Sequence, residues 1–119
     1  LAETLARVFD TFRTPTDRWT PFVPALAELR SAGVVDAFVS LLLGDGDPFD
    51  SVKVDFFQVP LVALERALDR MGLLGPDVPS PLRIGAELRL DAAEHVGLRF
   101  TETGVSVSVY YVPAAADGR

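Results

Sequence analysis

The sequence predicts a single α+β domain, in which an antiparallel sheet of about five strands packs with two to three helices. Three segments carry apolar residues at helical spacing, and a later stretch alternates apolar with polar residues, as strands with one buried face do. The length of 119 residues is that of one domain. We assign residues 1–113 to the domain and expect 114–119 to form a flexible tail.

The three helices are expected over 2–13, 20–31 and 61–72, where apolar residues recur every three or four positions. Thr20 is suited to cap the second helix, and Pro21 suits its first turn. Its buried face should contain Phe22, Leu26 and Leu29, and that of the third helix Leu61, Leu64, Leu68 and Met71.

Two groups of strands are expected. Residues 34–43 are almost all apolar and fit either a buried strand or a helix. We favour the strand, because the turn-rich loop 44–50 and a clear strand over 51–59 follow, which together make a hairpin. Alternation then predicts three further strands over 82–90, 96–101 and 105–111, joined by short turns into a meander.

Charge and composition exclude several classes of function. The formal net charge of −6 argues against nucleic acid as a partner, since phosphate binding needs a basic surface. The absence of Cys excludes disulfides, thiolate zinc sites and thiol nucleophiles. No apolar run is long enough to span a membrane, and the first residues do not resemble a signal peptide. We therefore expect a cytoplasmic protein without a membrane partner.

No catalytic set, metal site or cofactor motif is predicted. The single His, His95, follows the acidic segment 91–94 and is expected in an exposed turn, with no nucleophile motif to partner it. Asp45, Asp47 and Asp50 are expected to form turns, because a calcium loop that starts at Asp45 would need Glu where the chain has Phe56. Glycine-rich phosphate loops are absent.

The polar face of the predicted sheet is the candidate binding site. If this face is open to solvent, its charges form cross-strand pairs such as Glu87 with Arg99. If the sheet curls or packs on a partner, the same residues line a cavity that suits a small anionic ligand. The residues that we predict to bind it are Lys53, Arg83, Arg89, Arg99, Ser108 and Tyr110.

Phe57 points to the opposite side of its strand from Phe56, so both faces of that strand are apolar. Such a strand is expected to be covered on each side, by a helix or by a partner. This observation favours self-association or binding to a partner protein.

Three short stretches resemble a segment of the aromatic prenyltransferases that are built as barrels of repeated α-β-β-α units. They are Asp47-Pro48, the strand over 51–57, and the helix that ends at Met71-Gly72-Leu73. In that family a barrel strand carries a Lys near the prenyl diphosphate, and Lys53 matches it. The chain departs from the family at Asp55, where an aromatic residue is expected, and it supplies only part of the strands of such a barrel.

The sequence therefore favours non-catalytic binding or assembly, through a partner protein, a second copy or a small anionic ligand on the sheet face. No group of titratable residues has the spacing of a catalytic set. The alternative is an enzyme with a sheet-lined cavity, either related to the prenyltransferase barrels or using the arginines and Tyr110.

Overall fold

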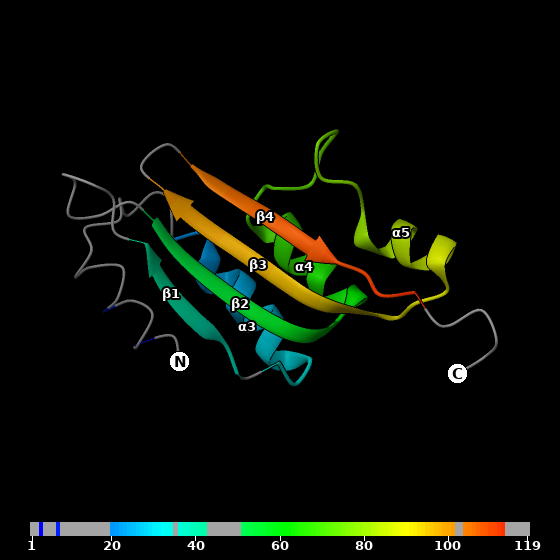
Figure 1. Ribbon diagram of the computed structural model, residues 1–119, viewed down its shortest axis with the longest axis horizontal. Helices are drawn as coiled ribbons and strands as arrows, with labels where there is room; N and C mark the ends of the chain where they lie inside the picture. Colours follow the sequence, from blue (N-terminus) through cyan, green and yellow to red (C-terminus); the bar gives the residue numbers. More distant parts are fainter. Residues whose placement is uncertain are drawn as a thin grey trace.

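The structure is a computed structural model that describes residues 3, 7, 20–34, 36–42, 51–101 and 104–113. Its strands form one antiparallel sheet in the order β1-β2-β3-β4, with α3 and α4 against one face (Figure 1). The predicted α+β fold is confirmed, and the described part of the sheet has four strands rather than about five. The elements are α3 (Phe22–Ser31), β1 (Phe38–Leu42), β2 (Ser51–Pro60), α4 (Leu61–Arg70), α5 (Pro81–Leu88), β3 (Ala92–Thr101) and β4 (Val105–Tyr110).

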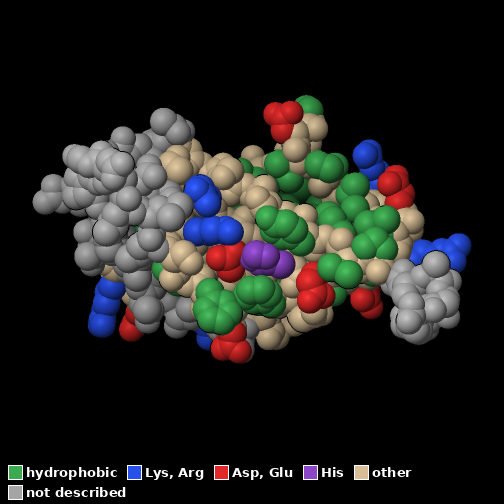
Figure 2. All heavy atoms as spheres, in the orientation of Figure 1, with side chains coloured by type: hydrophobic (Ala, Val, Ile, Leu, Met, Phe, Trp, Pro, Cys, Tyr) green, Lys and Arg blue, Asp and Glu red, His purple; other side chains and the backbone are tan. Residues whose placement is uncertain are grey.

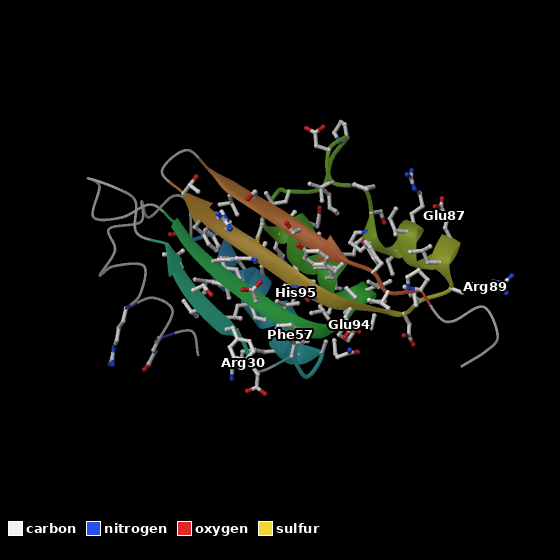
Figure 3. All side chains as sticks on the ribbon, in the orientation of Figure 1. Arg30, Phe57, Glu87, Arg89, Glu94 and His95 are labelled. Atoms are coloured by element: carbon white, nitrogen blue, oxygen red, sulfur yellow. The ribbon has the colours of Figure 1, made fainter. Side chains whose placement is uncertain are left out.

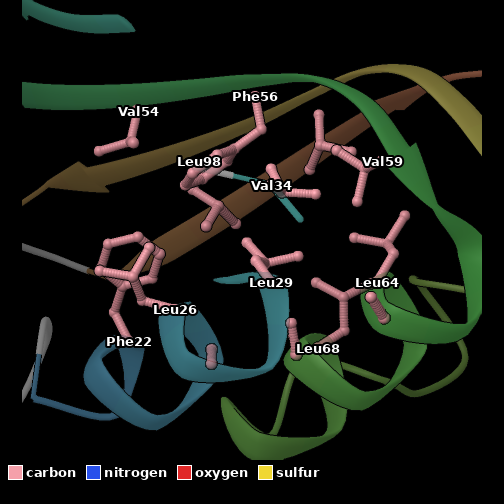
Figure 4. Close-up of a cluster of buried hydrophobic side chains, with 14 of the residues drawn as sticks. Phe22, Leu26, Leu29, Val34, Val54, Phe56, Val59, Leu64, Leu68 and Leu98 are labelled. Carbon is pink, nitrogen blue, oxygen red and sulfur yellow. The ribbon is translucent and has the colours of Figure 1, made fainter. Parts of the chain in front are cut away.

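The hydrophobic core lies between the sheet and the helices α3 and α4 (Figure 4). From α3 it takes Phe22, Leu26 and Leu29, as the helical spacing predicts. The ring of Phe22 lies 6.2 Å from that of Phe56 and 5.5 Å from that of Phe100, measured between centroids. These contacts anchor α3 on β2 and β3. From α4 the core takes Leu61, Ala63, Leu64, Ala67 and Leu68.

The ambiguous segment 34–43 contains strand β1. It pairs with β2 from Phe38 opposite Asp55 to Leu42 opposite Ser51. The strand alternative is therefore confirmed for residues 38–42, and the pairing with the next strand is the predicted hairpin. β1 and β4 are the two edges of the described sheet.

Residues 82–90 do not form the predicted strand, because 82–88 belong to helix α5 and Arg89 caps it. Ser80 starts the helix by accepting a hydrogen bond from the Arg83 backbone N–H, and Pro81 occupies the first turn. The helix buries Pro81 and Gly85, which are four residues apart, so the spacing that matters here is helical. The apolar alternation in this stretch misled the strand prediction.

Glu65 of α4 holds the start of α5 in place. Its Oε1 accepts hydrogen bonds from the Ser80 hydroxyl and from the Leu82 backbone N–H, the latter at 3.2 Å. A carboxylate at this end of a helix also interacts favourably with the helix dipole. Tyr111 packs against the core just after β4. Its partial burial is the main cause that raises the pKa of its phenol, and the negative charge of Glu65 raises it further.

Several predicted features lie outside the described residues. These are the acidic loop 44–50, the tail 114–119 and most of the helix over 2–13, of which only Glu3 and Arg7 are described, both as helical. None of the described helices has the length and apolar character needed to cross a membrane.

Gly85→Ala tests the helical assignment of α5. An added Cβ would overlap Leu61 Cδ1 and lie 2.8 Å from the Leu90 carbonyl oxygen. We therefore expect the free energy of unfolding to fall by about 1–3 kcal/mol in urea denaturation. Gly75→Ala is the matched control, since its Cβ meets nothing within 4 Å, and its effect should stay within about 0.5 kcal/mol. If the Gly85→Ala variant is as stable as the wild type, the result would contradict the helix and favour the predicted strand over 82–90, in which Gly85 faces solvent.

Glu65→Gln tests the environment of Tyr111. Because the folded pKa lies above the usual value of about 10, stability is complete below that pH and falls as pH rises through the folded pKa. The substitution removes the negative charge, so we expect Tyr111 to titrate at lower pH in ultraviolet absorbance of the phenolate. Tyr111→Phe identifies which of the two tyrosine transitions is measured. An unchanged Tyr111 midpoint in Glu65→Gln would contradict this account.

Candidate functional site

One face of the sheet is not covered by the described helices, and Figure 2 looks onto it. We call it the open face. Three large apolar side chains are exposed there, with exposed fractions of 67% for Phe38, 46% for Phe57 and 52% for Tyr110. In a strand, residues on this face alternate with the buried residues of the core. The open face consists of Phe38, Ser40, Lys53, Asp55, Phe57, His95, Gly97, Arg99, Ser106, Ser108 and Tyr110.

Four rings cross the open face, one from each strand. Figure 3 labels the two on the central strands, Phe57 and His95. His95 is paired with Phe57 on one side and with Tyr110 on the other. Its imidazole stacks between the two, with centroid distances of 4.8 Å to Phe57 and 5.0 Å to Tyr110. Phe38 meets Phe57 edge-on at 5.6 Å. We call these four residues the ring row, and their cross-strand contacts stabilise the sheet on its solvent side.

The backbone conformation of Gln58 allows Phe57 to face solvent while Val59, two residues later, faces the core. Simple alternation would put Phe57 and Val59 on the same face, yet Val59 is fully buried. The φ angle of Gln58 is 53°, in the left-handed region that side chains seldom adopt. Its amide donates a hydrogen bond of 2.8 Å to Glu94 Oε2 on the opposite strand. This local turn of the backbone returns β2 to the core just before α4 begins.

Asp55 is the one buried charged residue in the described part of the chain. Its Oδ1 lies 2.6 Å from His95 Nε2 and 3.4 Å from Lys53 Nζ. Because a carboxylate only accepts hydrogen bonds, the proton of this contact sits on His95 Nε2. The two partners offset the cost of burying the negative charge.

Gly97 leaves the space in which these side chains meet. It stands opposite Asp55 in the register. A Cβ at Gly97 would lie 3.0 Å from Asp55 Oδ1 and 3.0 Å from Lys53 Cε, closer than most real contacts. The absence of a side chain at Gly97 therefore lets the side chains of Lys53 and Asp55 pack closely against the backbone of β3.

The ring row divides the charges of the open face. Lys53 and Arg99 are cross-strand partners on the side toward the end of β3. Glu94 precedes the ring row on the same strand and lies on its other side (Figure 3), and Asp36 precedes it before β1. Among the described residues neither Arg99 nor Asp36 has an ion-pair partner. Among the described residues, the two cations of the open face therefore lie on one side of the ring row, and the acidic residues Glu94 and Asp36 lie beyond its other side.

A groove of about 650 Å³ adjoins the ring row at the β1 edge of the sheet. Phe38 and Phe57 form part of its wall. The segment between α3 and β1 supplies Gly33 and Val34, and Pro60 lines it at the end of β2. The open face therefore has a recess beside its most exposed ring.

The structure brings together four of the six residues that we predicted to bind a ligand. Arg83 and Arg89 belong to α5, as helical residue and C-cap, so their predicted place on the sheet face was wrong. Figure 3 shows Glu87 and Arg89 on α5, away from His95, so the predicted pairing of Glu87 with Arg99 was also wrong. The four residues on the open face are Lys53, Arg99, Ser108 and Tyr110.

The ring row does not follow from the sequence prediction, in which His95 lies in an exposed turn. Strand β3 begins at Ala92, so His95 is a half-buried strand residue and that prediction was wrong. A signal was available, because His95, Gly97 and Arg99 are two residues apart and share a face of any strand that contains them. The alternation of core residues alone gave no reason to extend the strand so far back.

No protein-family model, curated protein or solved structure matches the chain. In the described residues no group of three His, Asp or Glu side chains could hold a metal ion. The function must therefore be argued from the open face itself.

His95→Phe tests whether the bond to Asp55 supports the open face. The substitution keeps a ring in the stack and removes the Nε2 donor, which leaves the buried carboxylate with Lys53 alone. We expect the free energy of unfolding to fall by about 1–3 kcal/mol. Tyr110→Phe is the matched control, because it keeps its ring and loses only a half-exposed hydroxyl, and its effect should stay within about 0.5 kcal/mol. Equal stability of the two variants would show that the Asp55 contact contributes little.

Proposed function

We propose that the protein is a non-catalytic assembly domain that binds a second copy of itself through the open face. The observation that carries this proposal is the ring row, which gathers Phe38, Phe57 and Tyr110 on a face that the described helices leave uncovered. Single exposed apolar side chains are ordinary, but neighbouring ones on one face mark interaction sites. Burying them in an interface removes apolar area from water, which is the main driving force of association.

The size of the open face supports a protein partner. Strands β2 and β3 each have ten residues, so the face extends for about 33 Å along them. Across four strands it measures about 19 Å, and because β1 has only five residues and β4 six, the face covers roughly 500 Å² in plan. A stable interface buries about 800 Å² of accessible surface per partner, and accessible surface exceeds area in plan. One sheet face is thus large enough to form a specific contact.

The state of His95 supports binding rather than proton transfer. Phe57 and Tyr110 cover the two faces of the imidazole, and Nε2 is bonded to Asp55. A catalytic His that is held by a carboxylate also bonds the nucleophile that it activates, and no such bond joins His95 to a described Ser or Thr side chain. The stack and the Asp55 bond therefore favour a structural task for this side chain.

The charges also favour a protein surface over a small anion. With Arg83 and Arg89 on α5, only Lys53 and Arg99 of the four predicted cations remain on the open face. Lys53 is already paired with Asp55. Arg99, which has no ion-pair partner among the described residues, lies on the same face as the exposed rings. This combination is typical of an interface, where Arg and aromatic residues are enriched.

Light scattering of the purified protein tests this proposal. We expect a mass near twice the chain mass of 12.9 kDa for the wild type, and a single-chain mass for the variant with Phe38→Ser and Phe57→Ser. Val62→Ser is the matched control, because Val62 is 50% exposed on α4, and it should leave the mass unchanged.

Phe38→Ser alone guards against misfolding, since Phe38 is the most exposed ring and lies on an edge strand. Its melting temperature should stay close to that of the wild type while association weakens. A wild-type protein that remains a single chain at high concentration would refute assembly through the open face.

A further inference from the structure

The charges on either side of the ring row fix how two copies can meet. Resting on the proposed assembly, we infer that two copies pack face to face about a two-fold axis that crosses the strands beside the ring row, between Val96 and Gly97 of β3. In this arrangement Arg99 of each copy lies opposite the partner subunit's Glu94. The partner is thus a second copy in one defined orientation, with the strands of the two sheets running in opposite directions.

The orientation follows from symmetry. A dimer of identical chains uses the same patch twice, so each residue of one copy must face a residue that the operator brings to it. Rotation about an axis that crosses the strands places each strand of the second copy over the same strand of the first copy. The two strands of each such pair then run in opposite directions. Arg99 lies four residues after His95 on β3 and Glu94 one residue before it, so a rotation about an axis that crosses β3 midway between Arg99 and Glu94 exchanges their places.

The same operation pairs the two ends of the whole face. The basic end, with Lys53 and Arg99, meets the acidic end of the other copy, with Glu94 and Asp36. An axis parallel to the strands would instead place basic end on basic end, and juxtaposed like charges disfavour association. The division of charge among the described residues therefore selects the axis that crosses the strands.

Rings and charges have different tasks in this arrangement. The two ring rows lie on either side of the axis, near the centre of the interface, where water is excluded and apolar anchors contribute most to affinity. The Arg99–Glu94 contacts lie toward the rim, where ion pairs set orientation more than affinity. Aligned sheets pack about 10 Å apart with their strands at about 30° to each other. The two sheets of the dimer would therefore form a β-sandwich, with the open faces on the inside.

Charge reversal tests the orientation. Arg99→Glu places two acids opposite each other, and Glu94→Arg places two bases opposite each other, so we expect each variant to dissociate at concentrations roughly tenfold higher or more. An equimolar mixture of the two variants should form heterodimers, because the carboxylate introduced at position 99 of one chain would face the guanidinium introduced at position 94 of the other. Native mass spectrometry with one isotope-labelled variant distinguishes heterodimers from homodimers.

Two controls accompany this experiment. Arg83→Glu makes the same change of charge on α5 and should leave dissociation unchanged, since Arg83 lies off the open face. Glu94→Gln replaces Glu94→Arg if the larger change unfolds the chain, because Glu94 accepts a bond from Gln58. It should weaken the dimer less, and it should reduce the sensitivity of dissociation to salt.

Each result has a defined consequence. If neither charge reversal weakens the dimer while the ring-row variant does, the orientation is wrong and the assembly function stands. If both weaken it but the mixture does not recover, Arg99 does not face Glu94. If the wild type is a single chain, the assembly function fails together with the orientation.

Discussion

The pairing of β2 with β3 is the contact on which the rest of the structure depends. It runs from Ser51 opposite Thr101 to Pro60 opposite Ala92 and joins the two halves of the sheet. Because successive residues point to opposite faces, a slip of one position would turn the apolar residues of β2 toward solvent. The same register that builds the core also sets Asp55 over Gly97. Core and open face are therefore two results of one pairing.

Much of the fold could be predicted because strong periodic patterns leave few alternatives. The spacing of Phe22, Leu26 and Leu29 identified both α3 and its buried face, and the alternation in β2 did the same for the central strand. The strand prediction for 82–90 was wrong because the apolar residues of this stretch alternate with a period of two. What makes the stretch a helix is the capping of its first turn. The Ser80 hydroxyl and the Glu65 carboxylate fix that choice, and Glu65 comes from a different helix.

The candidate site was only partly predictable, for a different reason. Lys53, Arg99, Ser108 and Tyr110 follow from strand alternation, which the sequence shows directly. The ring row depends on His95, which joins the sheet only because β3 extends back to Ala92. That extension accompanies the left-handed turn at Gln58, and no residue type at that position signals such a backbone. Local geometry of this kind is set by tertiary contacts.

The ring row takes one side chain from each strand, and this has a consequence for folding. Asp55 and Gly97 stand opposite each other although they are far apart in the chain, so closing the central pairing costs more chain entropy than closing either hairpin. Before it closes, Phe38 and Phe57 are on one hairpin, and His95 and Tyr110 are on another. A truncated or half-folded chain therefore carries only fragments of the surface. Recognition through all four rings would act as a check that synthesis and folding are complete.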